Sequence, residues 1–267
     1  MPSIEENIRN WGHDHTWPSG GDEWSDGWGG SEKQWSGAIL PRIKEFLPTG
    51  TILEIAPGYG RWTQFLKDQC NHLTGVDLNS NCIEECRKRF ALDKNLEFVL
   101  NDGKSLDRIP DNSVDFIFSF DSLVHAEIDV IESYITQFPR ILKSNGASFI
   151  HHSNYAVYRG GDFVQMLSKV RGIRRLLNRM KPFGFRANPA WRANTVSASN
   201  FRRICESQGF ACRQELINWF TDYLNDCFST IVRSNSQAVI AAPAVTENYG
   251  FSEEAARIKG QPSGLPG

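Results

Sequence analysis

The sequence predicts an α/β fold built on a mostly parallel sheet. Two observations predict it: short apolar runs rich in β-branched and aromatic residues alternate with segments of helical spacing, and the first run ends in a glycine-rich turn that leads into a helix. Strands separated by helical segments need crossover connections, which make neighbouring strands parallel. A chain of 267 residues is long enough for one such domain with additions.

The expected elements follow from this alternation and from the residues that end helices. A first helix is expected over residues 38–47, because apolar residues recur at helical spacing up to a Pro-Thr-Gly stop. The elements expected after it are a strand at 51–56, a helix at 61–69, a strand at 73–76, a helix at 80–90, strands at 96–100 and 116–120, a helix at 130–142, a strand at 147–151, a helix from 197 to about 208, and last strands at 210–219, 227–233 and 237–242. Ligands of such open sheets bind beyond the carboxyl ends of the strands.

The turn after the first strand indicates a cofactor site. The strand carries Glu54 and ends in Gly58-Tyr59-Gly60, where glycine lets the backbone approach a ligand closely. The second strand ends on Asp77, an acid placed to accept hydrogen bonds from ribose hydroxyls. The third glycine of a dinucleotide fingerprint and the Lys-Ser/Thr pair of a Walker loop are both missing. Because Glu54 would repel a pyrophosphate, the turn favours a nucleoside ligand with an amino group and no phosphate.

This turn and the acid beyond it resemble motifs of the class I S-adenosylmethionine-dependent methyltransferases. Glu54-x-x-x-Gly58-x-Gly60 looks like their first motif, although Ala56 stands where the usual first glycine would be. Asp77 matches their ribose-binding acid. The family resemblance therefore rests first on the two strand ends that hold the cofactor.

Three later segments extend the resemblance in the same order. Residues 101–103, Asn-Asp-Gly, resemble the acidic turn that contacts adenine, and residues 113–120 and 142–150 resemble the fourth and fifth strands. The resemblance covers about residues 38–242. It implies a Rossmann-like sheet of seven strands with an antiparallel last hairpin, and S-adenosyl-L-methionine as the cofactor. The residues implied for cofactor binding are Glu54, Ala56, Gly58, Gly60, Trp62, Asp77, Leu78, Asp102, Gly103 and Phe120.

Histidines follow two predicted strand ends that we expect to be neighbours. Asp121 and His125 come after the fourth strand, and His151-His152 end the fifth. Methyl transfer needs an aligned acceptor and removal of its proton, and histidine is a suitable base near neutral pH. We therefore expect His125 or His152 to be the general base and Asp121 to orient it or to contact the substrate. Strand alternation sends His151 and His152 to opposite faces, and we expect His151 to pack against a helix or bond to backbone.

Other polar groups near these strand ends are weaker candidates. Asn154 and Tyr155 are possible substrate contacts, and His13-Asp14-His15 is a possible ligand group. Asp121, His125 and His152 could also gather a divalent metal. No zinc-like Cys/His spacing occurs in the sequence, and we expect no resident metal.

Residues 1–37 form a tryptophan-rich segment that we call the arm. It is rich in Gly, Asp and Ser but carries five of the eight tryptophans, at 11, 17, 24, 28 and 35, whereas disordered tails are poor in aromatic residues. We interpret it as a lid over the mouth of the site. The alternative is that these rings cover the outside of the sheet or a dimer contact.

The segments after the fifth strand are expected to be an insertion and a tail. Residues of about 154–194 show helical spacing of apolar residues, and no acidic residue occurs from Phe163 to Cys205. This basic helical insertion is either a solvated face, a lid over an anionic substrate, or a peripheral contact with an anionic membrane. Residues 243–267 contain prolines and glycines and are expected to be a flexible tail.

Composition narrows the function. The formal net charge of −2 argues against nucleic-acid binding, and no apolar run is long enough to span a bilayer. The first residues lack the features of a signal peptide, and six cysteines without a C-x-x-C pair favour free thiols in a reducing cytoplasm. We expect a methyltransferase acting on a hydroxyl of a small molecule, most plausibly a sugar, since tryptophans suit sugar faces. The alternatives are N-methylation of a small amine and a non-catalytic cofactor-binding scaffold, and the oligomeric state stays open.

Overall fold

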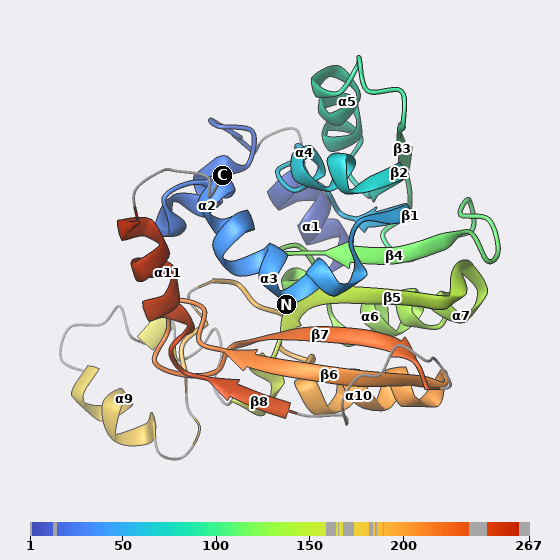
Figure 1. The fold of residues 1–267 in the computed structure, drawn as a ribbon. Helices are drawn as coiled ribbons and strands as arrows, with labels where there is room; N and C mark the ends of the chain where they lie inside the picture. The colour runs from blue at the N-terminus through green and yellow to red at the C-terminus, as the bar shows by residue number, and fades with distance from the viewer. Residues whose placement is uncertain are drawn as a thin grey trace.

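The computed structural model describes residues 2–12, 15–158, 164, 166–167, 174–181, 184, 186–188, 190–234 and 245–261. In this part of the chain the strands form one sheet in the order β3-β2-β1-β4-β5-β7-β6-β8 (Figure 1). The strands are β1 (Thr49–Ile55), β2 (Cys70–Asp77), β3 (Leu96–Leu100), β4 (Val114–Ser119), β5 (Leu142–Ser153), β6 (Phe210–Ile217), β7 (Asp226–Arg233) and β8 (Val245–Asn248). Neighbours from β3 to β5 pair in parallel, whereas β7 is antiparallel to both β5 and β6. The mostly parallel α/β sheet with an antiparallel hairpin is confirmed, and β8 adds an eighth strand beside β6.

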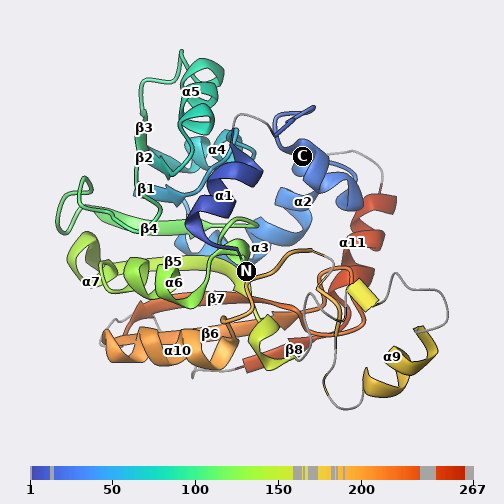
Figure 2. The same ribbon diagram turned by 180° about the vertical axis from the view of Figure 1, so that it is seen from behind.

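Helices cover both faces of this sheet. The α-helices are α1 (Ile4–Trp11), α2 (Ser31–Gln34), α3 (Leu40–Ile43), α4 (Thr63–Leu66), α5 (Ser80–Arg89), α6 (Ile128–Ile135), α7 (Phe138–Ile141), α9 (Arg174–Met180), α10 (Ala198–Ser207) and α11 (Phe251–Gly260). Short 3-10 or π turns are η1 (Asp22–Trp28), η2 (Trp35–Ile39), η3 (Lys44–Phe46), η4 (Lys67–Gln69), η5 (Leu123–His125) and η6 (Tyr155–Val157). Figures 1 and 2 show α3 and α11 on one side of the sheet and α6, α7 and α10 on the other. None of the described helices has the length and apolar character needed to cross a bilayer.

Successive side chains of β1 point to opposite faces of the sheet, so this strand contributes to two separate hydrophobic cores. Ile52 points into the cluster that contains Ile39 and Phe116, whereas Leu53 points into the cluster that contains Ile131 and Phe138. A strand buried on both faces reads as a continuous apolar run, which is why this strand could be predicted from its sequence. The central strand therefore carries its glycine-rich carboxyl end on a rigid support.

Two helices differ from the predictions because of proline. The helix expected at 38–47 is divided into η2, α3 and η3, since Pro41 has no N–H to donate to the preceding turn and the helix widens there. The helix expected at 130–142 is divided into α6 and α7, with Pro139 in the first turn of α7. The strand expected at 237–242 lies outside the described residues, and so do parts of the insertion at 154–194.

The flexible tail expected at 243–267 is wrong for residues 245–261, which form β8 and α11. Phe251, Ala255 and Ile258 are buried at helical spacing, and the Phe251 ring lies 5.1 Å from that of Trp28. A Cβ at Gly37 would come within 2.8 Å of Ile258. Of the prolines and glycines that suggested a loose tail, only Gly260 lies within α11, as its last residue. The apolar residues before it pack the helix against the base of the arm.

The same helix is tied to the sheet by Arg42. Its guanidinium forms ion pairs with Glu215 of β6 at 2.8 Å and with Glu254 of α11 at 3.0 Å. Arg42 also lies over the Phe228 and Phe251 rings, 5.6 and 5.3 Å from their centroids. One half-buried cation thus joins an N-terminal helix, the sheet and the last helix.

Candidate functional site

A cavity of about 880 Å³ lies at the carboxyl ends of β1, β2 and β4. The strand ends contribute Ala56, Pro57, Gly58, Tyr59, Val76, Asp77, Leu78, Asn79, Phe120, Asp121 and Ser122. The arm contributes Ile4, Asn7, Asn10, Trp11, His15, Trp17, Gly21, Glu23 and Trp24. The far wall is formed by Ala190, Trp191, Arg192, Trp219, Phe220 and Thr221. Three parts of the chain that are distant in sequence therefore meet at the position predicted for a ligand.

The glycine loop and Asp77 form one hydrogen-bonded unit. The Gly58 N–H donates to Oδ2 of Asp77 at 3.1 Å, and the Asn79 N–H donates to Oδ1 at 2.9 Å. Burial raises the pKa of Asp77 to about 6, although these two N–H groups act in the opposite direction. Both residues line the cavity, as the sequence suggested, and the bonds hold the loop against the end of β2.

Gly60 and Glu54 support this loop from behind and do not line the cavity. A Cβ at Gly60 would overlap the Phe90 ring, so the glycine is needed where α5 packs on the loop. Glu54 is 1% exposed and accepts a 2.5 Å hydrogen bond from Oγ1 of Thr63 at the start of α4. Burial raises the pKa of Glu54 to about 7, and the nearby Asp77 adds to the rise. The sequence grouped these residues with the ligand contacts, but the structure places them one layer deeper.

Ala56 lies in a backbone conformation that normally favours glycine. Its φ is +58°, and Asp121 at the end of the neighbouring strand has a φ of +60°. The two strand ends are joined because Oγ of Ser122 donates to the Ala56 carbonyl at 2.8 Å. Strained residues of this kind persist where the surrounding structure holds them in place, and they gather at functional sites. All three residues line the cavity.

Asp102 turns away from the cavity. Its Oδ1 accepts hydrogen bonds from the Lys104 and Ser105 N–H groups at 2.9 and 2.6 Å, and the side chain is exposed. These backbone donors hold the pKa of Asp102 below its ordinary value. Gly103 does line the cavity, and a Cβ added there would lie 3.6 Å from Leu78 and from Ile4 of α1. Asp102, which we expected to contact adenine, is therefore not part of the cavity wall, which here is apolar and includes a residue of the arm.

A buried ion network of five residues lies at the floor of the cavity. Arg61 pairs with Asp121 at 2.9 Å, and Arg192 binds Asp226 through Nε at 3.0 Å and Nη2 at 2.7 Å. The Asp121 N–H donates to Nδ1 of His151 at 3.1 Å, so Nε2 of His151 donates to Asp226 at 3.2 Å. Burial alone would raise the pKa of Asp121, but the Arg61 and Arg192 guanidiniums outweigh it and hold this pKa below its usual range. Arg192 and Asp226 were missed in the sequence, because both lie far along the chain from the ends of β1, β2 and β4.

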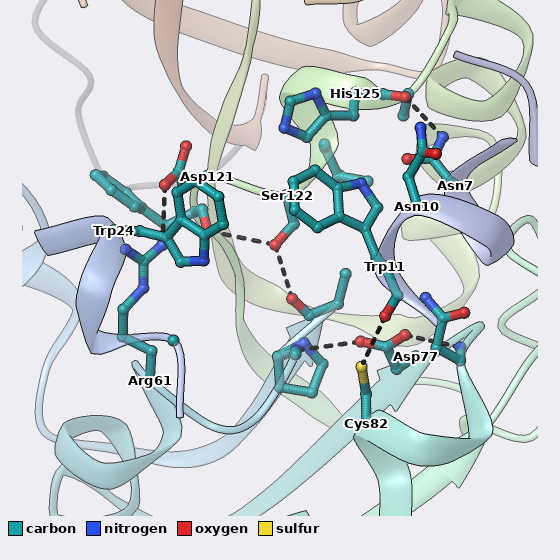
Figure 3. A pocket seen from close by; sticks show the side chains of 18 of the residues that line it. Asn7, Asn10, Trp11, Trp24, Arg61, Asp77, Cys82, Asp121, Ser122 and His125 are labelled. Atoms are coloured by element: carbon teal, nitrogen blue, oxygen red, sulfur yellow. Dashed lines mark hydrogen bonds and ion pairs between the residues drawn. The ribbon is translucent and has the colours of Figure 1, made fainter. Parts of the chain in front are cut away.

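His125 is oriented by the far wall of the cavity. Its Nδ1 donates to the Trp191 carbonyl at 2.9 Å, which leaves Nε2 without a proton. Burial, with Arg192 nearby, lowers the pKa of His125 to about 4, so the ring is neutral near neutral pH. Figure 3 shows Trp11 beside His125, and their ring centroids are 5.2 Å apart. Nδ2 of Asn7 donates to the His125 carbonyl at 2.9 Å, which ties α1 to the same turn.

His152 lies on the opposite face of β5 and lines no part of the cavity. Its ring stacks on Phe201 of α10 with centroids 3.9 Å apart, and its Nε2 lies 2.8 Å from Oγ of Ser229. Burial lowers its pKa to about 3. Strand alternation was predicted correctly, but the choice of His152 for the site was wrong, because His151 is on the cavity side and packs against Phe120, with centroids 4.9 Å apart. The bond to backbone expected of His151 is present, since its Nδ1 accepts from the Asp121 N–H.

The other candidate groups have structural partners or are only partly described. Asn154 donates to the Leu224 carbonyl and accepts from the Ala198 N–H, and it does not line the cavity; nor does Tyr155, whose hydroxyl donates to the Arg186 carbonyl. Since His152 faces away, the metal set of Asp121, His125 and His152 is not assembled. No group of three or more His, Cys, Asp or Glu that could hold a metal ion occurs among the residues with described positions. His13 and Asp14 lie outside the described residues.

The arm is divided between the cavity and the core. Trp17 stacks on Tyr59 of the glycine loop with centroids 4.7 Å apart, and Trp11 contacts Trp24 at 5.7 Å. Trp28 and Trp35 are instead buried in the core on the α11 side of the sheet. No described residue of α9 lines the cavity; among the described residues of the insertion, those that line it are residues 190–192.

Comparisons with known proteins agree with this arrangement. The sequence model of the family described as a methyltransferase domain matches residues 52–146, which include the glycine loop and the ends of β1 to β4. Phosphoethanolamine N-methyltransferase 1 of Triticum aestivum is 30% identical over 127 residues, which are 46% of this chain and 25% of that protein. The chain spans about a quarter of the length of the curated relatives that it matches.

Two solved structures share the fold. The PH0226 protein from Pyrococcus horikoshii OT3 has a TM-score of 0.51 and 19% identity, over 75% of this chain and 88% of that chain. Magnesium protoporphyrin IX methyltransferase from Synechocystis PCC 6803, solved with bound SAH, has a TM-score of 0.51 and 16% identity, over 85% and 92%. The sheet order, the glycine loop joined to the acid after β2, and the match over residues 52–146 lead to one conclusion: residues 52–146 match the methyltransferase-domain family, and the chain has the Rossmann-like fold of a class I methyltransferase.

Proposed function

We propose that the chain binds S-adenosylmethionine in the cavity and transfers its methyl group to a hydroxyl of a small molecule, with His125 as the general base. The observation that carries the proposal is the hydrogen bond from His125 to the Trp191 carbonyl, which leaves an unprotonated Nε2 in a cavity that the glycine loop also lines. A sugar or a similar polyol is the acceptor that we favour. Tryptophan rings line the cavity, and the C–H faces of sugars pack on aromatic rings.

The residues of the cavity fit the adenosyl group. Asp77 keeps lone pairs after accepting from two backbone N–H groups, so ribose hydroxyls can donate to it. Leu78, Gly103 and Ile4 offer an apolar wall for the adenine, and Trp62 and Phe120 line the cavity nearer Asp121. Small-molecule sites have volumes of roughly 300–1,000 Å³. A cavity of about 880 Å³ therefore leaves room for an acceptor beside the cofactor. When bound, the cofactor supplies a methyl group activated by its sulfonium.

His125 and Asp121 act on the acceptor from two sides. His125 stays neutral because its pKa is lowered to about 4, so Nε2 is free to accept the hydroxyl proton. An imidazole of such low basicity takes the proton late, once the acceptor oxygen has become acidic through its bond to the methyl group. Asp121, held between Arg61 and Arg192, is placed to orient a second polar group of the acceptor.

Binding and turnover test this proposal separately. Calorimetry with SAH should detect binding to the wild type and to His125→Ala alike, because His125 lies outside the loop that holds the adenosyl group. With isotope-labelled S-adenosylmethionine and a panel of methyl glycosides, His125→Ala should lose about 100-fold or more in kcat. His72→Ala, a partly buried histidine of β2 outside the cavity, is the matched control and should keep wild-type activity. Lack of affinity for SAH, or a fully active His125→Ala variant, contradicts the proposal.

N-methylation of a small amine is the second candidate. The matching curated relatives are phosphoethanolamine N-methyltransferases, and a neutral amine needs less help from a base than a hydroxyl does. Adding ethanolamine and phosphoethanolamine to the same panel separates the two. Methylation of the amines with little dependence on His125 supports N-methylation, whereas binding of SAH without any methylated product supports a non-catalytic scaffold.

The cysteines favour a reducing compartment as the place of action. All six are free thiols, and all but Cys70 are buried. Free thiols persist where disulfides are kept reduced, and this supports our proposal that the enzyme works in the cytoplasm.

A further inference from the structure

We propose that residues 15–23 of the arm form a subsite that binds hydroxyl groups of the acceptor, with Glu23 accepting and Trp17 donating a hydrogen bond. This inference rests on the proposed function and names the part of the chain that selects the acceptor. The segment lies outside the residues 52–146 that match the methyltransferase family. It is thus an addition to the domain that holds the cofactor.

Glu23 holds one carboxylate oxygen ready for a ligand. Its Oε2 accepts hydrogen bonds from the Ser19 and Gly21 N–H groups at 3.2 and 3.0 Å, which fix the carboxylate in place. Its Oε1 is buried and meets no donor among the described residues, although Glu23 lines the cavity. A buried acceptor left without a partner destabilises the folded protein, and more so when it is charged. Such an atom at the wall of a cavity is expected to receive its donor from the ligand.

Trp17 and His15 present further unpartnered polar atoms from the same segment. Nε1 of Trp17 and Nε2 of His15 are buried and have no partner in the described part of the chain, and both residues line the cavity. The two rings contact each other edge to face with centroids 4.9 Å apart. A donor and a fixed acceptor are therefore available within one short segment.

The packing of these rings places the subsite between the cofactor loop and the proposed base. Trp17 stacks on Tyr59, and a Cβ at Gly58 would lie 3.3 Å from the Trp17 ring. Trp11 joins the same aromatic group to His125, as Figure 3 shows for Trp11 and Trp24 near His125 and Asp121. An acceptor that reaches Nε2 of His125 from this side passes along the arm.

The chemistry of the wall matches hydroxyl groups better than an ion. A hydroxyl both donates and accepts, so it can satisfy a carboxylate oxygen and an indole N–H together. An anionic acceptor would meet the carboxylates of Glu23, Asp77 and Asp121. A cationic acceptor would meet Arg61 and Arg192 in the same cavity and the positive sulfonium of the cofactor. The exposed faces of a saccharide also suit the tryptophan rings.

Two substitutions test the subsite without removing the side chains that pack the arm. Glu23→Gln keeps an oxygen for the Ser19 and Gly21 N–H groups but replaces Oε1 by a donor, and Trp17→Phe keeps an aromatic ring but removes the indole N–H. The matched controls are Asp26→Asn, an exposed acid of the same arm, and Trp28→Phe, which removes an unpartnered indole N–H that lies in the core. Each variant is assayed with the methyl glycoside that the wild type methylates, and SAH affinity is measured by calorimetry.

The expected result is a rise in acceptor KM of about 10- to 100-fold for Glu23→Gln and about 3- to 10-fold for Trp17→Phe, with SAH affinity unchanged. Monodeoxy analogues of the same glycoside should identify the contacted hydroxyl. Removing that hydroxyl should weaken binding to the wild type but have little further effect on Glu23→Gln, because the two changes remove the same hydrogen bond.

The outcomes that overturn the subsite differ from those that overturn the proposed function. Three results would show that Glu23 does not bind the acceptor. They are a wild-type acceptor KM in Glu23→Gln, an equal rise in acceptor KM in Asp26→Asn, and a loss of SAH affinity in Glu23→Gln that parallels the rise in KM. If the wild type methylates amines and no glycoside, the hydroxyl-directed function itself is wrong, and the hydroxyl subsite is wrong with it.

Discussion

The backbone carbonyl of Trp191 accepts the Nδ1–H of His125 at 2.9 Å and thereby fixes which nitrogen of the imidazole carries the proton. Trp191 itself has a φ of +51°, a conformation that needs support from its neighbours. The next residue, Arg192, supplies that support through its two-point bond to Asp226 on β7. The protonation of one ring is therefore set by an ion pair on another strand.

Weakening this ion pair should misplace His125 without touching it. Arg192→Lys replaces a planar, two-point donor by a single ammonium, so the carbonyl of Trp191 should lose its fixed position. We expect kcat to fall by about 10-fold, with SAH affinity unchanged, and the imidazole nitrogen signals of His125 to show a mixture of tautomers by ¹⁵N NMR. Arg213→Lys, at the exposed pair with Glu45, is the control. A single unchanged His125 tautomer in Arg192→Lys would refute this coupling.

His125 and His152, which the sequence left as equal candidates for the base, should differ in their effects on stability and turnover. His152→Ala removes a ring stacked on Phe201 in the core and should lower the free energy of unfolding by about 2–4 kcal/mol. The folded fraction should keep its turnover, because His152 does not line the cavity. Denaturant unfolding together with activity per folded molecule measures both effects. Loss of turnover in folded His152→Ala would mean that β5 contributes its other face to the chemistry.

Glu54 should make the fold less stable at alkaline pH. Its pKa is raised to about 7 in the folded state, above the ordinary 4.5, so the folded protein keeps a proton that the unfolded chain has lost between these values. Stability therefore falls as the pH rises through this window, and Asp77, with a pKa of about 6, acts in the same direction. Glu54→Gln should gain about 3 kcal/mol relative to the wild type between pH 4 and pH 8. Denaturant unfolding at both pH values checks this, with the exposed Glu97→Gln as the control.

Ala56 should accept glycine but not a larger side chain. Ala56→Gly relieves the left-handed backbone while adding freedom to the unfolded chain, so the free energy of unfolding should change by no more than about 1 kcal/mol. Ala56→Val places a β-branched residue in that conformation and crowds the cavity, so both stability and SAH affinity should fall. Ala91→Val, at an exposed position outside the cavity, measures the effect of the added volume alone. An Ala56→Val protein with wild-type SAH affinity would contradict the assignment of Ala56 to the cofactor loop.

Arg42 should matter far more than a surface arginine. Arg42→Ala leaves Glu215 and Glu254 half-buried without their cation, and we expect a loss of about 2–4 kcal/mol in the free energy of unfolding. Arg213→Ala breaks an exposed pair and should cost no more than about 1 kcal/mol. Thermal or denaturant unfolding of the two variants compares them directly. Equal losses of unfolding free energy in the two variants would show that the Arg42 ion pairs stabilise the fold no more than the exposed pair of Arg213 with Glu45.

Features encoded by neighbouring residues could be predicted from the sequence. β3 has the bounds expected from its sequence, and the glycine loop and Asp77 meet as their spacing suggested, because strand patterns and turn residues act over a few positions. Asp102 shows what a motif alone cannot predict, which is the direction of the side chain. The motif gives the residue type, but the local turn supplies the Lys104 and Ser105 N–H groups that bind its carboxylate first.

Features that depend on distant segments could not be predicted. Arg192 and Asp226 are 34 residues apart and carry no motif, so only the folded sheet brings them under Asp121. A His-His doublet gives the alternation but not the direction, which was decided by the position of α10. In the tail, counting prolines and glycines over 25 residues hid the periodic apolar residues of α11.

The contact of α11 with Trp28 and Gly37 has a consequence for how the molecule is made. Synthesis proceeds from the N-terminus, so the Rossmann-like core can collapse while the last helix is still inside the ribosome. The base of the arm acquires its packing partner only when Phe251 and Ile258 emerge. A nascent chain can thus hold a formed glycine loop before the base of its arm is packed against α11.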